Sequence, residues 1–146
     1  MRTTGKAARR ERPHLANEEH LRILSEEVDA WNQWRKENPS AIPDLSAAAL
    51  CAANLRSFDL HGAALHEADL RGVNLREANL AAADLWKADL RRADLTTARL
   101  RWANLSEAQL HEADLSWTDL READLRRAIL RSANLRRSDL SKAYLG

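Results

Sequence analysis

The sequence predicts a solenoid, because leucine recurs with a period that suits neither a helix nor a strand. Leucine occupies every fifth position from Leu45 to Leu145, twenty-one times without exception. Five residues advance an α-helix by about 500°, which would scatter these leucines around it. On a strand, an odd spacing sends alternate side chains to opposite faces. A backbone that returns every leucine to one interior must therefore turn a corner within each five residues, as a solenoid does.

The residues around each leucine repeat as well. The residue two before it is Ala in sixteen of the twenty-one units, so a small and a large side chain are both expected to point inward. The residue just before it is Asp or Asn in fifteen units. Such side chains bond nearby backbone and favour turns, which suits a corner. The two residues after it are mostly Arg, Ser, His, Glu or Trp, and we expect them to face water.

Written as A-(D/N)-L-x-x, the unit resembles that of the pentapeptide-repeat family over residues 43–145. The Ala-Asp-Leu triplets lie at residues 68–70, 83–85, 88–90, 93–95, 113–115 and 123–125. The resemblance implies an all-β solenoid: a right-handed quadrilateral β-helix with four pentapeptides per coil and, from its twenty-one units, about five coils. Residues twenty apart would then lie above one another. One such outer column would contain Asn54, Asn74, Asp94, Asp114 and Asn134.

Two further segments are expected before the repeat domain, which we place at residues 41–146. Residues 1–16 are rich in Arg and Lys and are expected to form a disordered basic arm. Residues 17–40 are expected to hold one α-helix, because apolar residues recur there at spacings of three and four. Asn17 suits the N-cap of this helix, and Asn38 followed by Pro39 suits its end.

We expect this amphipathic helix to cap the first coil. The first coil of a β-helix exposes unpaired backbone groups and leucines, and such an edge invites aggregation. The alternative is a separate helix that binds a partner. The side chains expected to form the cap are Leu21, Leu24, Val28, Trp31 and Trp34 of the helix and Phe58 of the first coil.

The last coil has no obvious cap. Ile129 and Tyr144 occupy positions where Asp or Asn is usual, and the sequence stops at Leu145 and Gly146 while still in phase with the repeat. Exposed apolar groups beside an open edge mark a contact surface. We therefore expect a homodimer joined end to end through Ile129, Tyr144 and Leu145. The alternative is that the chain merely ends here.

Three tryptophans are the most unusual of the residues expected to face outward. Trp86, Trp102 and Trp117 all fall in the two positions after a leucine. Large aromatic rings without a core role are typical anchors of protein interfaces. We therefore expect these three residues to bind a protein partner. The alternative is that the rings lie flat over neighbouring side chains and shield the backbone.

Composition excludes several classes of function. The single cysteine, Cys51, allows no internal disulfide, and no apolar run approaches the roughly 20 residues that span a bilayer. A cytoplasmic protein without a membrane partner is expected. No catalytic constellation, phosphate-binding glycine loop or histidine pattern typical of a metal site is present in the sequence. We therefore expect no enzyme activity, no cofactor and no metal.

The family resemblance also implies a partner. Some pentapeptide-repeat proteins are similar to a DNA duplex in width and negative charge, bind type II topoisomerases such as DNA gyrase, and protect their host from topoisomerase poisons, self-made antibiotics included. In this chain the repeats carry fifteen acids and fifteen bases, with an acidic excess over residues 57–120 and a basic excess over 121–146.

Together these observations predict a non-catalytic protein-binding β-helix. Its most concrete version is a DNA mimic that protects a topoisomerase. A general interaction scaffold is the alternative. Nucleic-acid binding through the basic C-terminal tip is a second alternative, for which the sequence shows no base-reading module.

Overall fold

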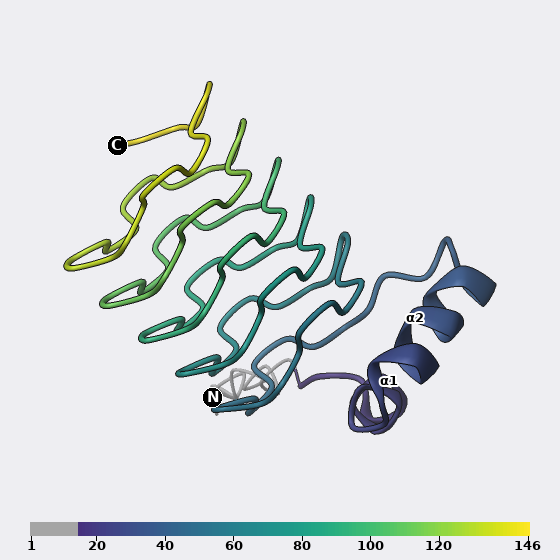
Figure 1. Ribbon diagram of the computed structural model, residues 1–146. Coiled ribbons are helices and arrows are strands. Elements are labelled where there is room, and N and C mark those ends of the chain that lie inside the picture. Colours follow the sequence, from purple (N-terminus) through teal and green to yellow (C-terminus); the bar gives the residue numbers. More distant parts are fainter. Residues whose placement is uncertain (1–14) are drawn as a thin grey trace, which may run out of the picture.

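Two short helices precede a stack of four-sided coils in the computed structural model (Figure 1). The structure describes residues 15–146, so nearly all of the expected basic arm lies outside the described residues. Helix α1 spans Glu18–Leu24 and helix α2 spans Val28–Glu37. Isolated parallel β-bridges then join residues twenty apart, from Asp44 with Ala64 to Asp124 with Tyr144. Each coil is therefore four pentapeptides long.

Each pentapeptide turns one corner and bonds to its neighbouring coils. The Leu85 carbonyl accepts a hydrogen bond from the Ala88 N–H at 3.0 Å, which closes a β-turn. Lys87, the residue before Ala88, has a φ of 55°, and the corresponding residue of nearly every unit also has a positive φ, as a type II turn requires. The Leu85 N–H donates to the Asn104 carbonyl of the next coil at 2.7 Å. A positive φ costs a non-glycine residue about 1 kcal/mol or more. The hydrogen bonds between coils stabilise the corners and offset this cost.

The leucines fill one continuous core, as the repeat predicts. Every repeat leucine from Leu60 to Leu120 has no exposed surface, and the alanines two residues before these leucines are at most 1% exposed. Thr118 replaces one of these alanines, and its hydroxyl is satisfied by donating to the Leu115 carbonyl at 2.7 Å. Burial decreases in the first coil, where Leu50 is only partly buried, and more strongly toward the C-terminal end, where Leu145 is 65% exposed.

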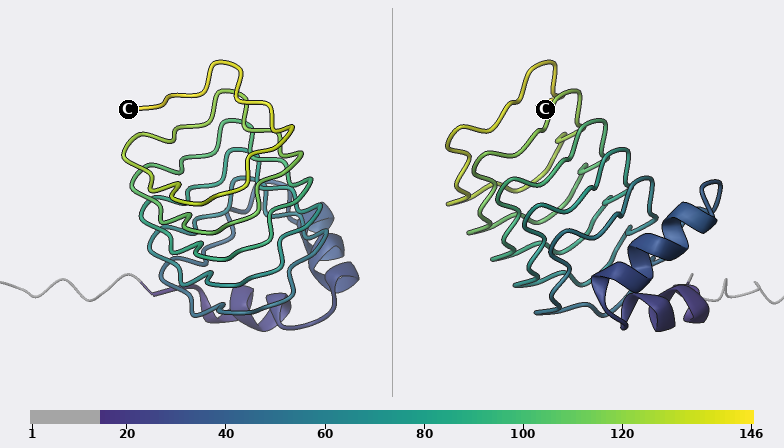
Figure 2. Two further views of the ribbon diagram at one scale, coloured as in Figure 1. Left: turned by 60° about the vertical axis from the view of Figure 1, so that its left-hand side comes forward. Right: turned by 45° about the vertical axis from the view of Figure 1, so that its right-hand side comes forward.

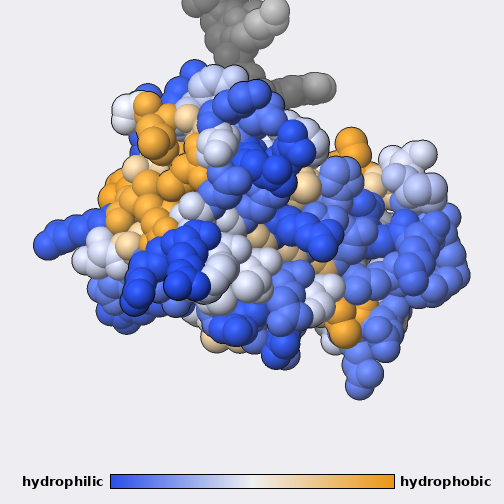
Figure 3. All heavy atoms as spheres, turned by 45° about the horizontal axis from the view of Figure 1, so that its top comes forward, coloured by the Kyte–Doolittle hydropathy of each residue, from blue (hydrophilic) through white to orange (hydrophobic). Residues whose placement is uncertain are grey.

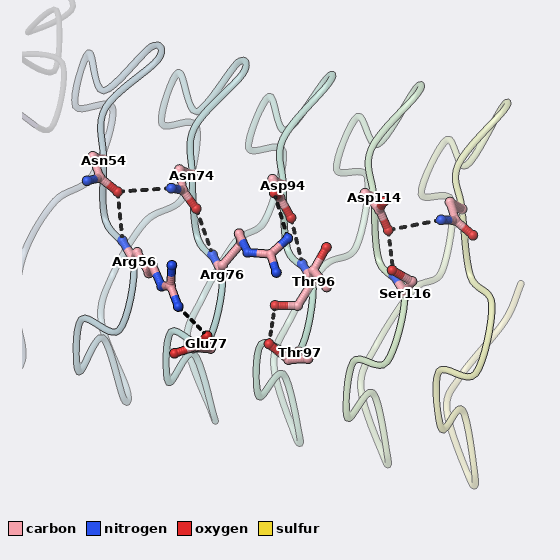
Figure 4. Close-up of polar contacts among 11 residues, drawn as sticks. Asn54, Arg56, Asn74, Arg76, Glu77, Asp94, Thr96, Thr97, Asp114 and Ser116 are labelled. Carbon is pink, nitrogen blue, oxygen red and sulfur yellow. Dashed lines mark hydrogen bonds and ion pairs between the residues drawn. The ribbon is translucent and has the colours of Figure 1, made fainter.

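The Asp and Asn side chains before the leucines serve both the corner and the stack (Figure 4). The Asn74 Oδ1 accepts from the Arg76 N–H at 3.1 Å, which fixes the local turn. The Asn74 Nδ2 donates to the Asn54 Oδ1 of the preceding coil at 3.0 Å. Asp94 accepts from the Thr96 N–H at 3.0 Å in the same way. Asp therefore suffices for the corner, whereas Asn also cross-links two coils.

The expected single helix over residues 17–40 is wrong, because α1 ends at Leu24 and α2 starts only at Val28. The Ser25 hydroxyl donates to the Arg22 carbonyl at 2.6 Å, a local bond that competes with helix continuation. The N-cap is confirmed: the Asn17 Oδ1 accepts from the N–H groups of Glu19 and His20 at 2.9 and 3.2 Å. Neither helix has the length and apolarity needed to cross a membrane.

Both helices lie at the N-terminal end of the stack (Figure 2), where α2 takes the place of a preceding coil along one side. The Asn32 Oδ1 accepts from the Asp59 N–H at 2.8 Å, and the Trp31 Nε1 donates to the Asp59 carbonyl at 2.8 Å. The Arg35 Nη2 donates to the His61 carbonyl at 2.9 Å. These backbone groups of the first coil would otherwise be unpaired.

The aromatic residues of α2 also close the end of the leucine core. Trp31 has no exposed surface, and its ring lies 6.2 Å from the ring of Phe58, which is 4% exposed. Trp34 packs beside Trp31 with 5.2 Å between ring centroids. The remaining residues expected at the cap, Leu21, Leu24 and Val28, are buried or partly buried against the same cluster.

Candidate protein-binding surface

Two of the three outward tryptophans border one side of the coil stack. Trp117 occupies the corner at which this side begins, and Glu122 occupies the corner at which it ends. Trp102 is twenty residues before Glu122, so it lies at that second corner in the preceding coil. Trp102 and Trp117 are 52% and 55% exposed. We call this side, with its two tryptophans, the Trp-bordered side.

A cation covers each of these indole rings. The Arg101 guanidinium lies 3.9 Å from the ring centroid of Trp102, and that of Arg137 lies 4.4 Å from the ring centroid of Trp117. Cation–π contacts of this kind contribute about 0.5–1 kcal/mol at exposed sites. Arg101 also donates to Glu122 at 2.9 Å, a hydrogen bond that lowers the pKa of Glu122. The Trp102 ring is therefore held in position before any partner binds.

Trp86 is placed differently from the other two tryptophans. It is only partly exposed, lies on another side of the coils, and has the Lys87 Nζ 4.2 Å from its ring centroid. The sequence predicts the same partner-binding role for Trp86, Trp102 and Trp117, because all three lie in the two positions after a leucine. The structure does not bring Trp86 together with them.

The C-terminal coil carries a second apolar surface, visible as the orange patch on the left of Figure 3. Ile129, Tyr144 and Leu145 are 46%, 62% and 65% exposed. Leu130 and Leu135 of the same coil are only partly buried, and their N–H groups have no hydrogen-bond acceptor among residues 15–146. Ile129, Tyr144 and Leu145 are the residues that the sequence predicts to form a dimer contact.

The repeat identified from the leucines matches a family model described as pentapeptide repeats, in eight copies over residues 44–80, 74–111 and 108–146. The chain is a pentapeptide-repeat protein. Members of this family form a right-handed quadrilateral β-helix, and the twenty-residue register of the bridges agrees with that fold. No curated protein sequence matches the chain.

Solved structures of other pentapeptide-repeat proteins are similar to this one. Alr5209 from Nostoc PCC 7120 is 36% identical, with a TM-score of 0.63 over 79% of this chain and 94% of that protein. HetL, which is involved in regulating heterocyst differentiation in Nostoc sp. strain PCC 7120, is 32% identical, with a TM-score of 0.56 over 68% of this chain. The chain spans only 58% of the length of HetL.

More distant matches carry less information. A pentapeptide-repeat protein of the Arabidopsis thaliana thylakoid lumen is 28% identical, with a TM-score of 0.50 over 68% of this chain and 63% of that protein. QnrB1, a plasmid-mediated fluoroquinolone resistance protein, matches at 16–21% identity with TM-scores of 0.29–0.32. This likeness to QnrB1 is too low to support a shared function.

Charges on the pentapeptide-repeat protein neutralise one another locally. Four arginines each bond the aspartate two residues earlier with an Nη2–Oδ2 distance of 2.6 Å; the pairs are Asp69–Arg71, Asp89–Arg91, Asp119–Arg121 and Asp124–Arg126. The arginine hydrogen bond lowers the pKa of each of these aspartates. Two of these arginines also approach the aspartate stacked in the next coil, with the Arg71 Nε 3.9 Å from Asp89 and the Arg121 Nε 3.8 Å from Asp139.

The stability of the pentapeptide-repeat protein should therefore depend on pH. A folded-state pKa below the unfolded value of about 3.9 stabilises the fold above that pH, and this contribution is lost as pH falls through the folded value. We expect the urea midpoint of unfolding to be constant between about pH 7 and 5 and to fall below about pH 4. Asp124→Asn should show a smaller acid-induced drop. A midpoint that is unchanged down to about pH 2.5 would contradict this account.

The sequence did not reveal a groove of about 590 Å³ on the side opposite the Trp-bordered side. Its lining includes Cys51, Arg71, Gly72, Arg91, Arg92 and His111. The sequence does contain a signal for this groove. Residues twenty apart share one corner column, and in this column two small residues precede two long ones: Ala52, Gly72, Arg92 and Glu112. Among residues 15–146, no three His, Cys, Asp or Glu side chains gather as metal ligands.

Proposed function

We propose that this pentapeptide-repeat protein is a non-catalytic protein-binding module that uses Trp102 and Trp117 as its anchors. The observation that carries the proposal is the pair of half-exposed indole rings at the two edges of the Trp-bordered side. Backbone hydrogen bonds between coils, such as that from the Trp117 N–H to the Arg136 carbonyl at 3.0 Å, hold the two corners, so the tryptophans keep a fixed backbone separation. Buried aromatic anchors of this kind supply much of the affinity of protein interfaces.

Affinity capture with paired variants tests this function. The double variant Trp102→Ala, Trp117→Ala should lose a partner protein that the unmodified chain enriches from a cell extract of its source, as measured by quantitative mass spectrometry. Each anchor should contribute at least about 2 kcal/mol, so the double loss amounts to roughly a thousandfold in affinity. Trp86→Ala is the matched control, because it removes an indole ring from another side and should retain the partner.

An equal loss of every partner in Trp86→Ala and in the double variant would contradict the proposed anchors. So would a partner that binds all three proteins equally well. Far-ultraviolet circular dichroism of each variant checks that the coils are intact.

The narrower hypothesis of a DNA-mimicking topoisomerase partner, giving protection or self-resistance against poisons, remains a proposal. It is supported by the acidic excess over residues 57–120. It is weakened by the Arg–Asp pairs, since Asp69, Asp89 and Asp119 each have a bound arginine and present little free negative charge. A gyrase supercoiling assay with a poison tests it, and the absence of any protection at micromolar protein would remove it.

Binding of nucleic acid through the basic C-terminal tip is the second alternative. Arg131 and Arg136 of this tip have no acidic partner among the described residues, which favours it. Such binding would weaken steeply with salt. A complex with nucleic acid that keeps its affinity at about 0.5 M salt would contradict binding through this basic tip.

The cytoplasmic location also remains a prediction, which cell fractionation tests.

We further propose that two copies pair end to end through the C-terminal coil. Tyr144→Asp places a charge in the exposed apolar patch and should convert a dimer into a monomer at micromolar concentration, as seen by sedimentation velocity. Tyr144→Phe keeps the ring and should leave the dimer intact. A sedimentation coefficient that is the same for the unmodified chain and for Tyr144→Asp would contradict this contact.

A further inference from the structure

The groove on the side opposite the Trp-bordered side has a floor of small residues and a wall of arginines. Ala52 and Gly72 occupy the corner in the first two coils and leave it open. Arg71 and Arg91 stand beside this hollow in successive coils, separated by the strand spacing of about 4.8 Å. Arg92, at the corner of the third coil, closes the hollow.

Each of the two stacked arginines is bound by an aspartate through two of its three nitrogens. Arg71 uses its Nε and Nη2 for Asp69, at 2.7 and 2.6 Å. Arg91 uses the same two atoms for Asp89, at 2.8 and 2.6 Å. This leaves the Nη1 group of each guanidinium without a hydrogen bond among residues 15–146. Two fixed pairs of N–H donors thus stand one coil apart.

The far end of the groove offers further donors. Arg92 binds Glu112 through its Nε at 2.9 Å, and neither of its terminal nitrogens has a hydrogen bond to residues 15–146. The His111 Nδ1 is buried in the groove wall and has no hydrogen-bond partner within the described part of the chain. Because solvent does not reach this nitrogen, His111 shapes the groove wall and is not counted among the donors of the groove.

We propose that this groove binds a small anion that carries phosphate or carboxylate groups. The planar guanidinium group of arginine donates paired hydrogen bonds to both phosphate and carboxylate oxygens. The groove volume of about 590 Å³ suits a small molecule. Because Asp69 and Asp89 offset part of the positive charge, recognition depends on the positions of the N–H donors more than on net charge. This site does not depend on the proposed function of the Trp-bordered side, since it lies on the other side of the coils.

The two glycine corners provide a matched pair of variants for the test. Gly72 has a φ of +61° and Gly62 a φ of +64°, and a Cβ added at either meets nothing within 4 Å. Gln at either position adopts a corner conformation that Glu77 and Lys87 already adopt. Gly72→Gln fills the groove, whereas Gly62→Gln places the same side chain on another corner. Any general strain from the substitution is therefore the same in both variants.

Two readouts of the full-length chain follow binding. Isothermal titration calorimetry with inorganic pyrophosphate and with succinate, at constant ionic strength, measures affinity and distinguishes a phosphate from a carboxylate ligand. Alkylation of Cys51 by iodoacetamide provides an independent measure, because Cys51 lines the groove and is the single cysteine of the chain. A bound anion should slow this alkylation in a saturable way.

We expect saturable binding of at least one probe to the unmodified chain and to Gly62→Gln, with affinity at least about tenfold lower in Gly72→Gln. Arg91→Gln should show a similar loss. Arg121→Gln is its control, since Arg121 makes the same bonds to Asp119 outside the groove. The proposal is overturned if neither probe binds saturably at up to about 20 mM, or if Gly72→Gln binds as well as Gly62→Gln.

Discussion

An alanine in place of Leu95 is expected to lower the free energy of unfolding by about 3–5 kcal/mol, the range for a fully buried leucine. Leu95 lies in the central coils and has no exposed surface. Its N–H donates to the Asp114 carbonyl at 2.8 Å, and the Asp94 N–H donates to the Val73 carbonyl at 2.9 Å. Because both neighbouring coils hold this backbone, the wall cannot collapse into the cavity, and the cost should fall at the upper end of the range.

Urea unfolding followed by circular dichroism measures this effect. Leu145→Ala provides the control, because Leu145 is 65% exposed and its truncation should change stability by less than about 0.5 kcal/mol. Leu135→Ala, in the partly open last coil, should give an intermediate loss. Equal losses at Leu95 and Leu145 would show that the leucine column is not the stabilising core.

The second large effect is expected at the N-terminal end, where Trp31→Ala should cost about 3–5 kcal/mol and open the first coil. Trp31 is fully buried against Phe58, and its Nε1 donates to the Asp59 carbonyl at 2.8 Å. Truncation therefore leaves a cavity, an unpaired carbonyl and an exposed edge that other chains can pair with.

Hydrogen exchange distinguishes a cap from a helix that merely rests on the stack. In Trp31→Ala, amides of residues 44–60 should lose protection, while those of residues 90–120 should keep it, because each coil depends mainly on its neighbours. Trp34→Ala is the milder control, since Trp34 is only partly buried. Unchanged protection of residues 44–60 in Trp31→Ala would mean that α1 and α2 do not cap the β-helix.

The repeats could be predicted in detail because one physical constraint acts on every unit. A leucine such as Leu95 must reach the interior every five residues, and this predicts the corner and the outward direction of Trp102 and Trp117. The twenty-residue register follows instead from the resemblance to the pentapeptide-repeat family. The break between α1 and α2 follows from a local bond of Ser25, which hydrophobic periodicity does not register. The N-cap at Asn17 was predictable because its signal is itself local.

Differences between units were harder to predict. Trp86 was expected to be exposed like Trp102, but Trp86 is the first residue after its leucine and is partly buried, whereas Trp102 and Trp117 are the second and lie at exposed corners. The groove beside Arg71 arises because Gly72 and Ala52 stack in one column. Such a relation appears only when residues twenty apart are compared, and the five-residue pattern conceals it.

The twenty-residue register also determines which changes of chain length this architecture tolerates. Duplication of a full coil between Trp102 and Trp117 would lengthen the rod by about 4.8 Å and leave both indole rings bordering the same wall. Insertion of a single pentapeptide there would instead turn everything after it by a quarter revolution. Evolution by whole-coil duplication can thus extend the molecule and preserve a binding surface, whereas a five-residue insertion would redistribute its recognition residues among the walls.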